Sequence, residues 1–161
     1  MTDLTTVIAY LDALLEPSQW ADYGPNGLQV PGRADIRSVV TGVSAHAELF
    51  ERAAAAGAGL VLVHHGLFWR GEPLEIDRVR RHRLGLLFEH DMALAAYHLP
   101  LDGHPEHGNN ARLAQELGAE RTEPAFAHGG APVGVVARFG ADGVAPQELL
   151  RRVRAVTERE D

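Results

Sequence analysis

The sequence contains no cysteine and no lysine, and each absence excludes a kind of chemistry. Without cysteine there can be no disulfide, no thiolate nucleophile and no Cys-ligated zinc site. All 15 basic residues are arginines, so neither a Schiff-base lysine nor the lysine of a P-loop is present. Serine is also scarce, and Ser18, Ser38 and Ser44 all lie outside any Gly-x-Ser-x-Gly motif. Whatever chemistry the chain carries must therefore use other side chains.

Long apolar runs and an excess of positive charge are missing as well. No apolar run approaches the ~20 residues that span a bilayer, and the N-terminus lacks the basic and apolar segments of a signal peptide. The net charge of −7 argues against a protein that mainly coats nucleic acid or an anionic membrane surface. We therefore expect a cytoplasmic protein that has no membrane partner and shows no strong nucleic-acid signal.

Strand and helix patterns alternate along the first 118 residues. Apolar and β-branched segments at 36–43, 60–63 and 93–97 predict strands, and the fully apolar run 60–63 is typical of a buried parallel strand. This alternation predicts an α/β fold with a parallel-stranded sheet and helices on both faces. The intervening helical patterns cover 4–15, about 45–56, about 77–89 and 109–117, the last with Asn109 or Asn110 as its N-cap.

The character of the sequence changes after Gly118. Residues 119–132 are polar, contain Gly and Pro, and are expected to form a linker or long loop. A strand over 133–139 and an amphipathic helix from Pro146 to about residue 158 follow it. We therefore expect an α/β domain over residues 1–120, then a linker and the start of a second α/β lobe over residues 121–161.

Five of the nine histidines lie in two short segments, and each segment begins where a predicted strand ends. His64 and His65 follow the strand at 60–63, and the segment 98–107 follows the next strand. Ligands of parallel α/β sheets bind beyond the carboxyl ends of the strands, so we expect His64, His65 and Asp102 to converge. Imidazole and carboxylate ligands suit zinc, manganese, iron, cobalt or nickel. The first domain is therefore predicted to bind a divalent metal.

Simpler interpretations of these residues remain open. In a regular strand His64 and His65 would point to opposite faces, and Gly66 would have to let the backbone turn for both to reach one site. The alternative is one buried, hydrogen-bonded histidine and one exposed histidine. Asp102 could be a turn residue, and His98 could orient a ligand without binding metal itself.

A basic cluster on the predicted helix 77–89 also has two interpretations. Its four arginines form either a solvated helix face with interface ion pairs or an anion-binding site for a phosphate substrate. These residues are Arg78, Arg80, Arg81 and Arg83.

Four blocks of the sequence together resemble the signature of a known family. The blocks are Asp22–Val30, Val63–Trp69, His98–Asp102 and Gly108–Asn110. In order and spacing they resemble the NIF-three-like dinuclear metal centre family, whose bacterial members are known as GTP cyclohydrolase I type 2 homologues. The resemblance covers about residues 1–118. It implies a two-lobed α/β fold, a two-metal centre and a ring-shaped homohexamer.

The resemblance also implies roles for single residues. His64 and His65 resemble the ligands that go one to each metal, and Asp102 resembles the carboxylate ligand. Asn26 and His98 match positions near the site, as groups that orient a ligand or contact substrate. The family's remaining ligands are a His and a Glu four residues later, and nothing after His128 fits that pattern. We therefore expect this sequence to be C-terminally incomplete relative to the family.

The predicted function follows from the ligand set and the resemblance. We expect a divalent-metal-binding protein that holds two metal ions in the complete protein and acts as a hydrolase on a nucleotide-like small molecule such as GTP. The alternative is a non-catalytic, metal-binding or regulatory oligomeric protein. An enzyme would need a general acid or base that no metal occupies, and His98 and Glu106 are the candidates.

Overall fold

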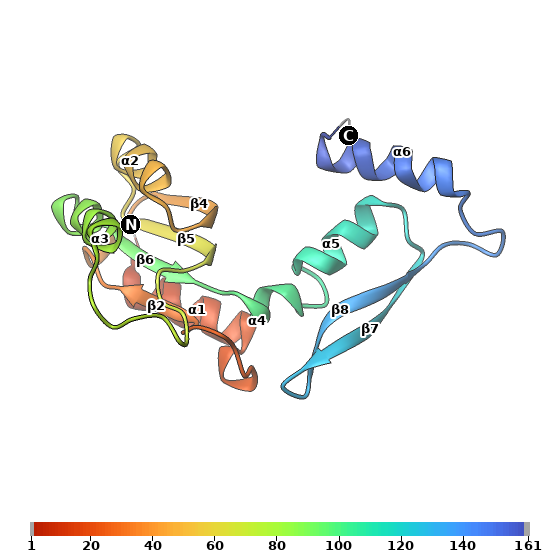
Figure 1. Ribbon diagram of the computed structural model, residues 1–161, viewed down its shortest axis with the longest axis horizontal. Coiled ribbons are helices and arrows are strands. Elements are labelled where there is room, and N and C mark those ends of the chain that lie inside the picture. The colour runs from red at the N-terminus through yellow and green to blue at the C-terminus, as the bar shows by residue number, and fades with distance from the viewer. Residues whose placement is uncertain (1, 160–161) are drawn as a thin grey trace. The chain divides into compact units, whose positions relative to one another are not determined.

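The structure is a computed structural model that describes residues 2–159. It divides into two compact units, Met1–His98 and Leu99–Asp161, which are described separately (Figure 1). The domain boundary expected at residue 120 is not tested by this division and stays a prediction. The first unit contains β1 (Thr2–Asp3), α1 (Leu4–Leu15), the 3-10 turn η1 (Pro17–Gln19), β2 (Gly27–Val30), β3 (Asp35–Ile36), β4 (Val39–Ser44), α2 (Ala47–Ala55), β5 (Leu60–His65), α3 (Arg78–Glu89) and β6 (Ala93–Ala96).

The centre of the first unit is a four-stranded sheet with the order β2-β6-β5-β4. Strands β4, β5 and β6 are parallel to one another, and β2 runs antiparallel along β6. The predicted α/β fold with a mainly parallel sheet is therefore confirmed. A separate antiparallel pair, β1 with β3, was not predicted, because two residues in each strand give no readable alternation.

Helices cover both faces of this sheet. Val61, Val63, Leu94 and Ala96 occupy one face and pack in a buried cluster with side chains of α2 and α3, such as Phe50. The next residues along each strand point to the opposite face of the sheet. On that face the Tyr97 hydroxyl donates a hydrogen bond of 2.7 Å to Asp12 of α1. Burial on both faces explains why β5 and β6 are apolar without alternation.

The second unit is built on a hairpin and helices. It contains α4 (Leu99–Asp102), α5 (Asn109–Glu116), β7 (Arg121–His128), β8 (Ala131–Arg138) and α6 (Pro146–Thr157). Strands β7 and β8 form a two-stranded antiparallel sheet, and both α4 and α5 contact β8. Helix α6 has no buried side chain among its residues. No helix in residues 2–159 combines the length and apolar character that crossing a membrane requires.

Two local predictions in this unit were wrong. The segment 119–132 was expected to be a linker, but residues 121–128 form strand β7. Pro124 and Pro132 had suggested a loop; a two-stranded sheet consists of two edges, and an edge strand tolerates proline. Asn109 or Asn110 was expected to cap α5, but the N-cap is Gly108, which makes no side-chain capping bond.

Candidate metal centre

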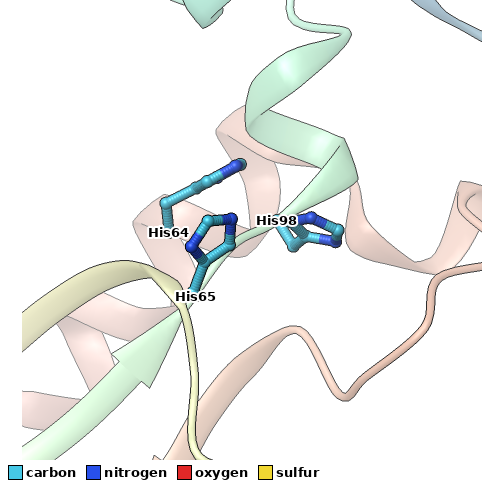
Figure 2. Close-up of side chains that lie close together, drawn as sticks. All are labelled: His64, His65 and His98. Atoms are coloured by element: carbon cyan, nitrogen blue, oxygen red, sulfur yellow. The ribbon is translucent and has the colours of Figure 1, made fainter. Parts of the chain in front are cut away.

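Three histidines of the first unit converge at the carboxyl ends of β5 and β6. Each of His64, His65 and His98 offers one ring nitrogen, and these three atoms lie within 4.8 Å of one another (Figure 2). His64 and His65 are the last residues of β5, and His98 follows β6, its parallel neighbour. His64 and His65 therefore lie together with His98 at this end of the sheet, and their predicted role as metal ligands stays a prediction.

Adjacent strand residues meet here because their rings are held by different neighbours. The His64 Nδ1 lies 3.2 Å from the Tyr97 carbonyl oxygen on the β6 side. The His65 Nδ1 lies 3.0 Å from the Ser44 hydroxyl at the end of β4. The two ring centroids are 4.5 Å apart. The β5–β6 pairing ends at Val63 and Ala96, so the His64 ring can lean toward Tyr97 while His65 is still paired with Ser44, and opposite strand faces do not keep the two rings apart.

The third ring is positioned by a buried carboxylate. The His98 Nδ1 lies 2.7 Å from Asp22 Oδ1, and the Asp22 side chain is only 2% exposed. Asp22 also accepts hydrogen bonds from the Tyr23 backbone N–H and from the Asn26 side chain. Asn26 in turn accepts a 2.7 Å hydrogen bond from the His98 backbone N–H. Asp22 and Asn26 therefore fix both the ring and the backbone of His98, and the predicted orienting role fits Asn26.

Two of these contacts identify the ring nitrogen that His64 and His98 can present to a metal. A carbonyl oxygen and a carboxylate only accept hydrogen bonds, so Nδ1 of His64 and of His98 carries the proton. In a neutral imidazole the lone pair then lies on Nε2. A ligand histidine whose other nitrogen is bonded to a carbonyl or carboxylate is the usual arrangement of protein metal sites. The donor set therefore fits a divalent transition metal.

Gly66 matters for a different reason from the one predicted. Its φ lies outside the left-handed region, so the backbone does not require glycine for its conformation. A Cβ at this position would instead lie 2.2 Å from the Gln29 amide nitrogen. The Gln29 side chain uses the space to accept a 2.8 Å hydrogen bond from the Leu67 backbone N–H. Because Gly66 has no side chain, Gln29 of β2 can bind the backbone directly after the two histidines.

Aromatic side chains and open pockets surround the three imidazoles. The Trp69 ring lies 5.1 Å from the His98 ring, edge to face, and 6.0 Å from the His65 ring. A pocket of about 380 Å³ beside His65 is also lined by Trp69 and Arg83. A second pocket of about 410 Å³ lies between Trp69 and Tyr23. The metal-ligand candidates therefore have access to space that a small molecule can occupy.

A buried tyrosine supports the strand end from the other side. Burial, together with the hydrogen bond to Asp12, raises the pKa of Tyr97 well above its usual value. The phenol therefore stays protonated at ordinary pH and remains a hydrogen-bond donor to α1. Because the Tyr97 carbonyl contacts His64, this anchoring also holds one of the three imidazoles.

The structure places Asp102 in the second unit, at the end of α4. Its carboxylate accepts a 2.9 Å hydrogen bond from the Asn109 side chain, and its carbonyl oxygen accepts one from Asn110. The predicted role of Asp102 as a metal ligand is not tested by these contacts and stays a prediction. His104 and His107 stack on each other, and the His104 ring accepts from the His107 backbone N–H, so they organise their own loop.

One member of the site was missed at the sequence level. Asp22 begins the block Asp22–Val30, yet nothing in the local sequence distinguishes it from an exposed turn aspartate. Its hydrogen bond to His98 joins two residues that are 76 positions apart in the sequence, so neither this bond nor its burial can be read from the local sequence. The one available signal was its place four residues before Asn26, which its side chain contacts.

Comparison with known proteins assigns the whole chain to one group. Residues 2–160 match the family described as Duf34/NIF3 (NGG1p interacting factor 3). A protein of Pseudomonas aeruginosa named GTP cyclohydrolase 1 type 2 homolog is 42% identical over 158 residues, which cover 98% of this chain and 62% of the relative. A protein of the same name from Yersinia pestis is 52% identical over 66% of this chain and 43% of its own length. The chain thus spans about two fifths to three fifths of these relatives.

Solved structures agree with this assignment. The protein ybgI, of unknown function, matches with a TM-score of 0.89 and 36% identity over 99% of this chain and 62% of its own length. The protein TTHA1606 from Thermus thermophilus matches with a TM-score of 0.88 and 37% identity, over 99% of this chain and 63% of its own. HcgD from Methanocaldococcus jannaschii, at 20% identity and a TM-score of 0.78, shares the fold.

Proposed function

This chain belongs to the Duf34/NIF3 (NGG1p interacting factor 3) family, and we propose that it carries part of a divalent-metal centre in a hydrolase that acts on a nucleotide-like substrate. The observation that carries the proposal is the convergence of His64, His65 and His98. The name shared by the curated relatives, GTP cyclohydrolase 1 type 2 homolog, supports a nucleotide-like substrate.

The imidazoles would hold the metal, and their supports would keep them in place. Because each Nδ1 has a protein partner, Nε2 is the proposed ligand atom of all three rings. A bound divalent ion supplies Lewis-acid polarisation of the substrate. The Trp69 ring beside the histidines would limit the access of bulk water.

Metal titration tests the first half of the proposal. Calorimetric titration of the chain with zinc and manganese should show binding, and alanine at His64, His65 or His98 should weaken it by about tenfold or more. His82→Ala is the matched control, because this histidine is exposed on α3 and lies outside the cluster. Equal affinities in all four variants and the wild type would contradict the metal centre.

Two further predictions are attached to this centre. Asp102 is proposed as a carboxylate ligand, and Asp102→Asn in the same titration tests it. A screen of the metal-loaded protein against nucleotides and phosphoesters tests hydrolysis. Metal binding without turnover on any substrate would favour the alternative, a metal-binding or regulatory oligomeric protein. The homohexamer and the cytoplasmic location expected from the sequence stay predictions.

A further inference from the structure

The four arginines of α3 have different environments in the structure. The Arg80 guanidinium is bonded to the Glu72 carboxylate at 2.7 Å and to the carbonyl oxygens of Pro73 and Glu75, so it fastens the loop before the helix. Arg78 and Arg81 line a separate pocket along α3. The fourth, Arg83, lines the pocket beside the metal centre. Arg80 and Arg83 also line a small pocket together, but only Arg83 of the four lines the pocket beside His65.

Arg83 combines a pocket position with an unused charge. Its side chain is half-buried, and within residues 2–159 it makes no hydrogen bond or ion pair. A guanidinium without a protein partner can bind an oxyanion through two parallel hydrogen bonds. The same pocket is lined by His65 of the metal cluster and by the Trp69 ring. A cation, an aromatic ring and a candidate metal ligand thus share one cavity.

The dimensions of the cavity favour one class of ligand. Its volume of about 380 Å³ falls in the range of roughly 300–1,000 Å³ that is usual for small-molecule sites. An aromatic wall binds flat rings, and an unpaired arginine binds phosphate. A compound that carries both groups uses both walls. His46 and Ser44 also line it.

We propose that Arg83 and Trp69 form the substrate-recognition pocket beside the metal centre, in which Arg83 binds a phosphate group and Trp69 packs on a planar ring of the same molecule. The proposal rests on the proposed function, because it names how that site would select a nucleotide-like substrate. Arg83 would determine specificity for the phosphate-bearing form. Its role is separable from metal binding, since it does not belong to the histidine cluster.

Equilibrium binding of guanosine 5′-monophosphate, guanosine and inorganic phosphate tests the proposal without any need for turnover. Calorimetry would be run on the zinc-free and on the zinc-loaded chain. Arg83→Gln should weaken binding of the monophosphate by about tenfold or more. The affinity for guanosine should stay within about twofold of the wild-type value. The monophosphate affinity of Arg83→Lys should lie between those of the wild type and Arg83→Gln. Trp69→Leu should weaken guanosine and the monophosphate together.

Arg81→Gln is the matched control, because it removes the same charge from the same helix but from a different pocket. Unchanged monophosphate binding in Arg83→Gln, equal losses in Arg83→Gln and Arg81→Gln, or no binding by the wild type in either metal state would each overturn the proposal. Thermal unfolding and zinc titration of Arg83→Gln should match the wild type. Loss of monophosphate binding with intact zinc affinity supports the pocket even if the hydrolase proposal fails.

Discussion

Residues 1–98 and residues 99–161 are stabilised in different ways. The first unit packs Phe50 and Leu87, both fully buried, against the strands of its sheet. In the second unit, α6 has no buried side chain and Phe126 of the hairpin is 72% exposed. The unit that holds the three histidines is the one with a dense apolar core. Dense packing restricts side-chain motion, so the comparison links the core to the fixed geometry of the imidazoles.

Polar contacts differ between the units in the same sense. The first unit buries the Asp22 carboxylate, which accepts hydrogen bonds from His98, Tyr23 and Asn26. The second unit keeps its clearest ion pairs, such as Glu148 with Arg151, at the surface. Charged hydrogen bonds that are shielded from water are worth more than exposed pairs. We therefore expect substitutions to be costly in the first unit and mild in the second.

The largest expected difference between the units is in the stability lost when a leucine is replaced by alanine. Leu87→Ala removes a fully buried side chain from the core cluster and should lower the free energy of unfolding by about 2–5 kcal/mol. Leu149→Ala, on the half-buried face of α6, should cost about 1 kcal/mol or less. Urea unfolding followed by circular dichroism measures both. Equal costs would remove the distinction between a packed and a sparsely packed unit.

A smaller effect is expected at the buried carboxylate. Asp22→Asn keeps the size of the side chain but removes the charge that holds the protonated Nδ1 of His98. Zinc affinity should fall by about 10–100-fold. The exposed Asp35→Asn on β3 serves as the control and should leave zinc affinity unchanged. Unchanged zinc binding in Asp22→Asn would mean that the apolar core alone positions the His98 ring. The units would then differ in apolar packing and not in buried polar contacts.

The smallest effect is expected from the surface pair of the second unit. Hydrogen bonds from Arg151 and Arg152 lower the pKa of Glu148 from 4.5 to about 2. A depressed carboxyl pKa stabilises the folded chain above about pH 4.5, and this contribution is lost as the pH falls toward 2. Because the pair is exposed, Glu148→Gln should lower the unfolding midpoint at pH 7 by about 2 °C or less.

The difference between Glu148→Gln and the wild type should also shrink as the pH approaches 2. A carboxyl titration of Glu148 by NMR checks the pKa itself. A large loss of stability at neutral pH would instead show that surface charge holds the second unit together.

Sequence patterns predict the fold best where the elements are long and their patterns strong. The helical spacing at residues 4–15 matches α1 at both ends, and the apolar runs identify β5 and β6. The hairpin strand β7 escapes prediction, because Pro124 argues against a strand unless the partner pairing is known. Pairing joins residues that are distant in sequence, so no local pattern reveals it.

The candidate site is predicted in part for a related reason. Histidines at two strand ends indicate a site, because parallel strands bring their carboxyl ends to one edge. The relative importance of the histidines is less accessible: the sequence favours His98 as an orienting group, although its ring lies with the other two. Burial of Asp22 depends on the packing of the 22–26 turn against the strand end. Such burial follows from tertiary structure, and the spacing of Asp22 and Asn26 is the one trace of it in the sequence.

The long sequence separation of the histidine anchors has a consequence for how the protein folds. His65 is tied to a residue 21 positions away, His64 to one 33 positions away and His98 to one 76 positions away. Contacts between distant residues carry the highest loop-closure entropy and slow the search for the native state. We therefore expect the Asp22–His98 contact to form after the β4–β5 and β5–β6 pairings. During refolding, zinc affinity would then recover more slowly than the helical circular dichroism signal. The rate of its recovery would measure the last step of folding.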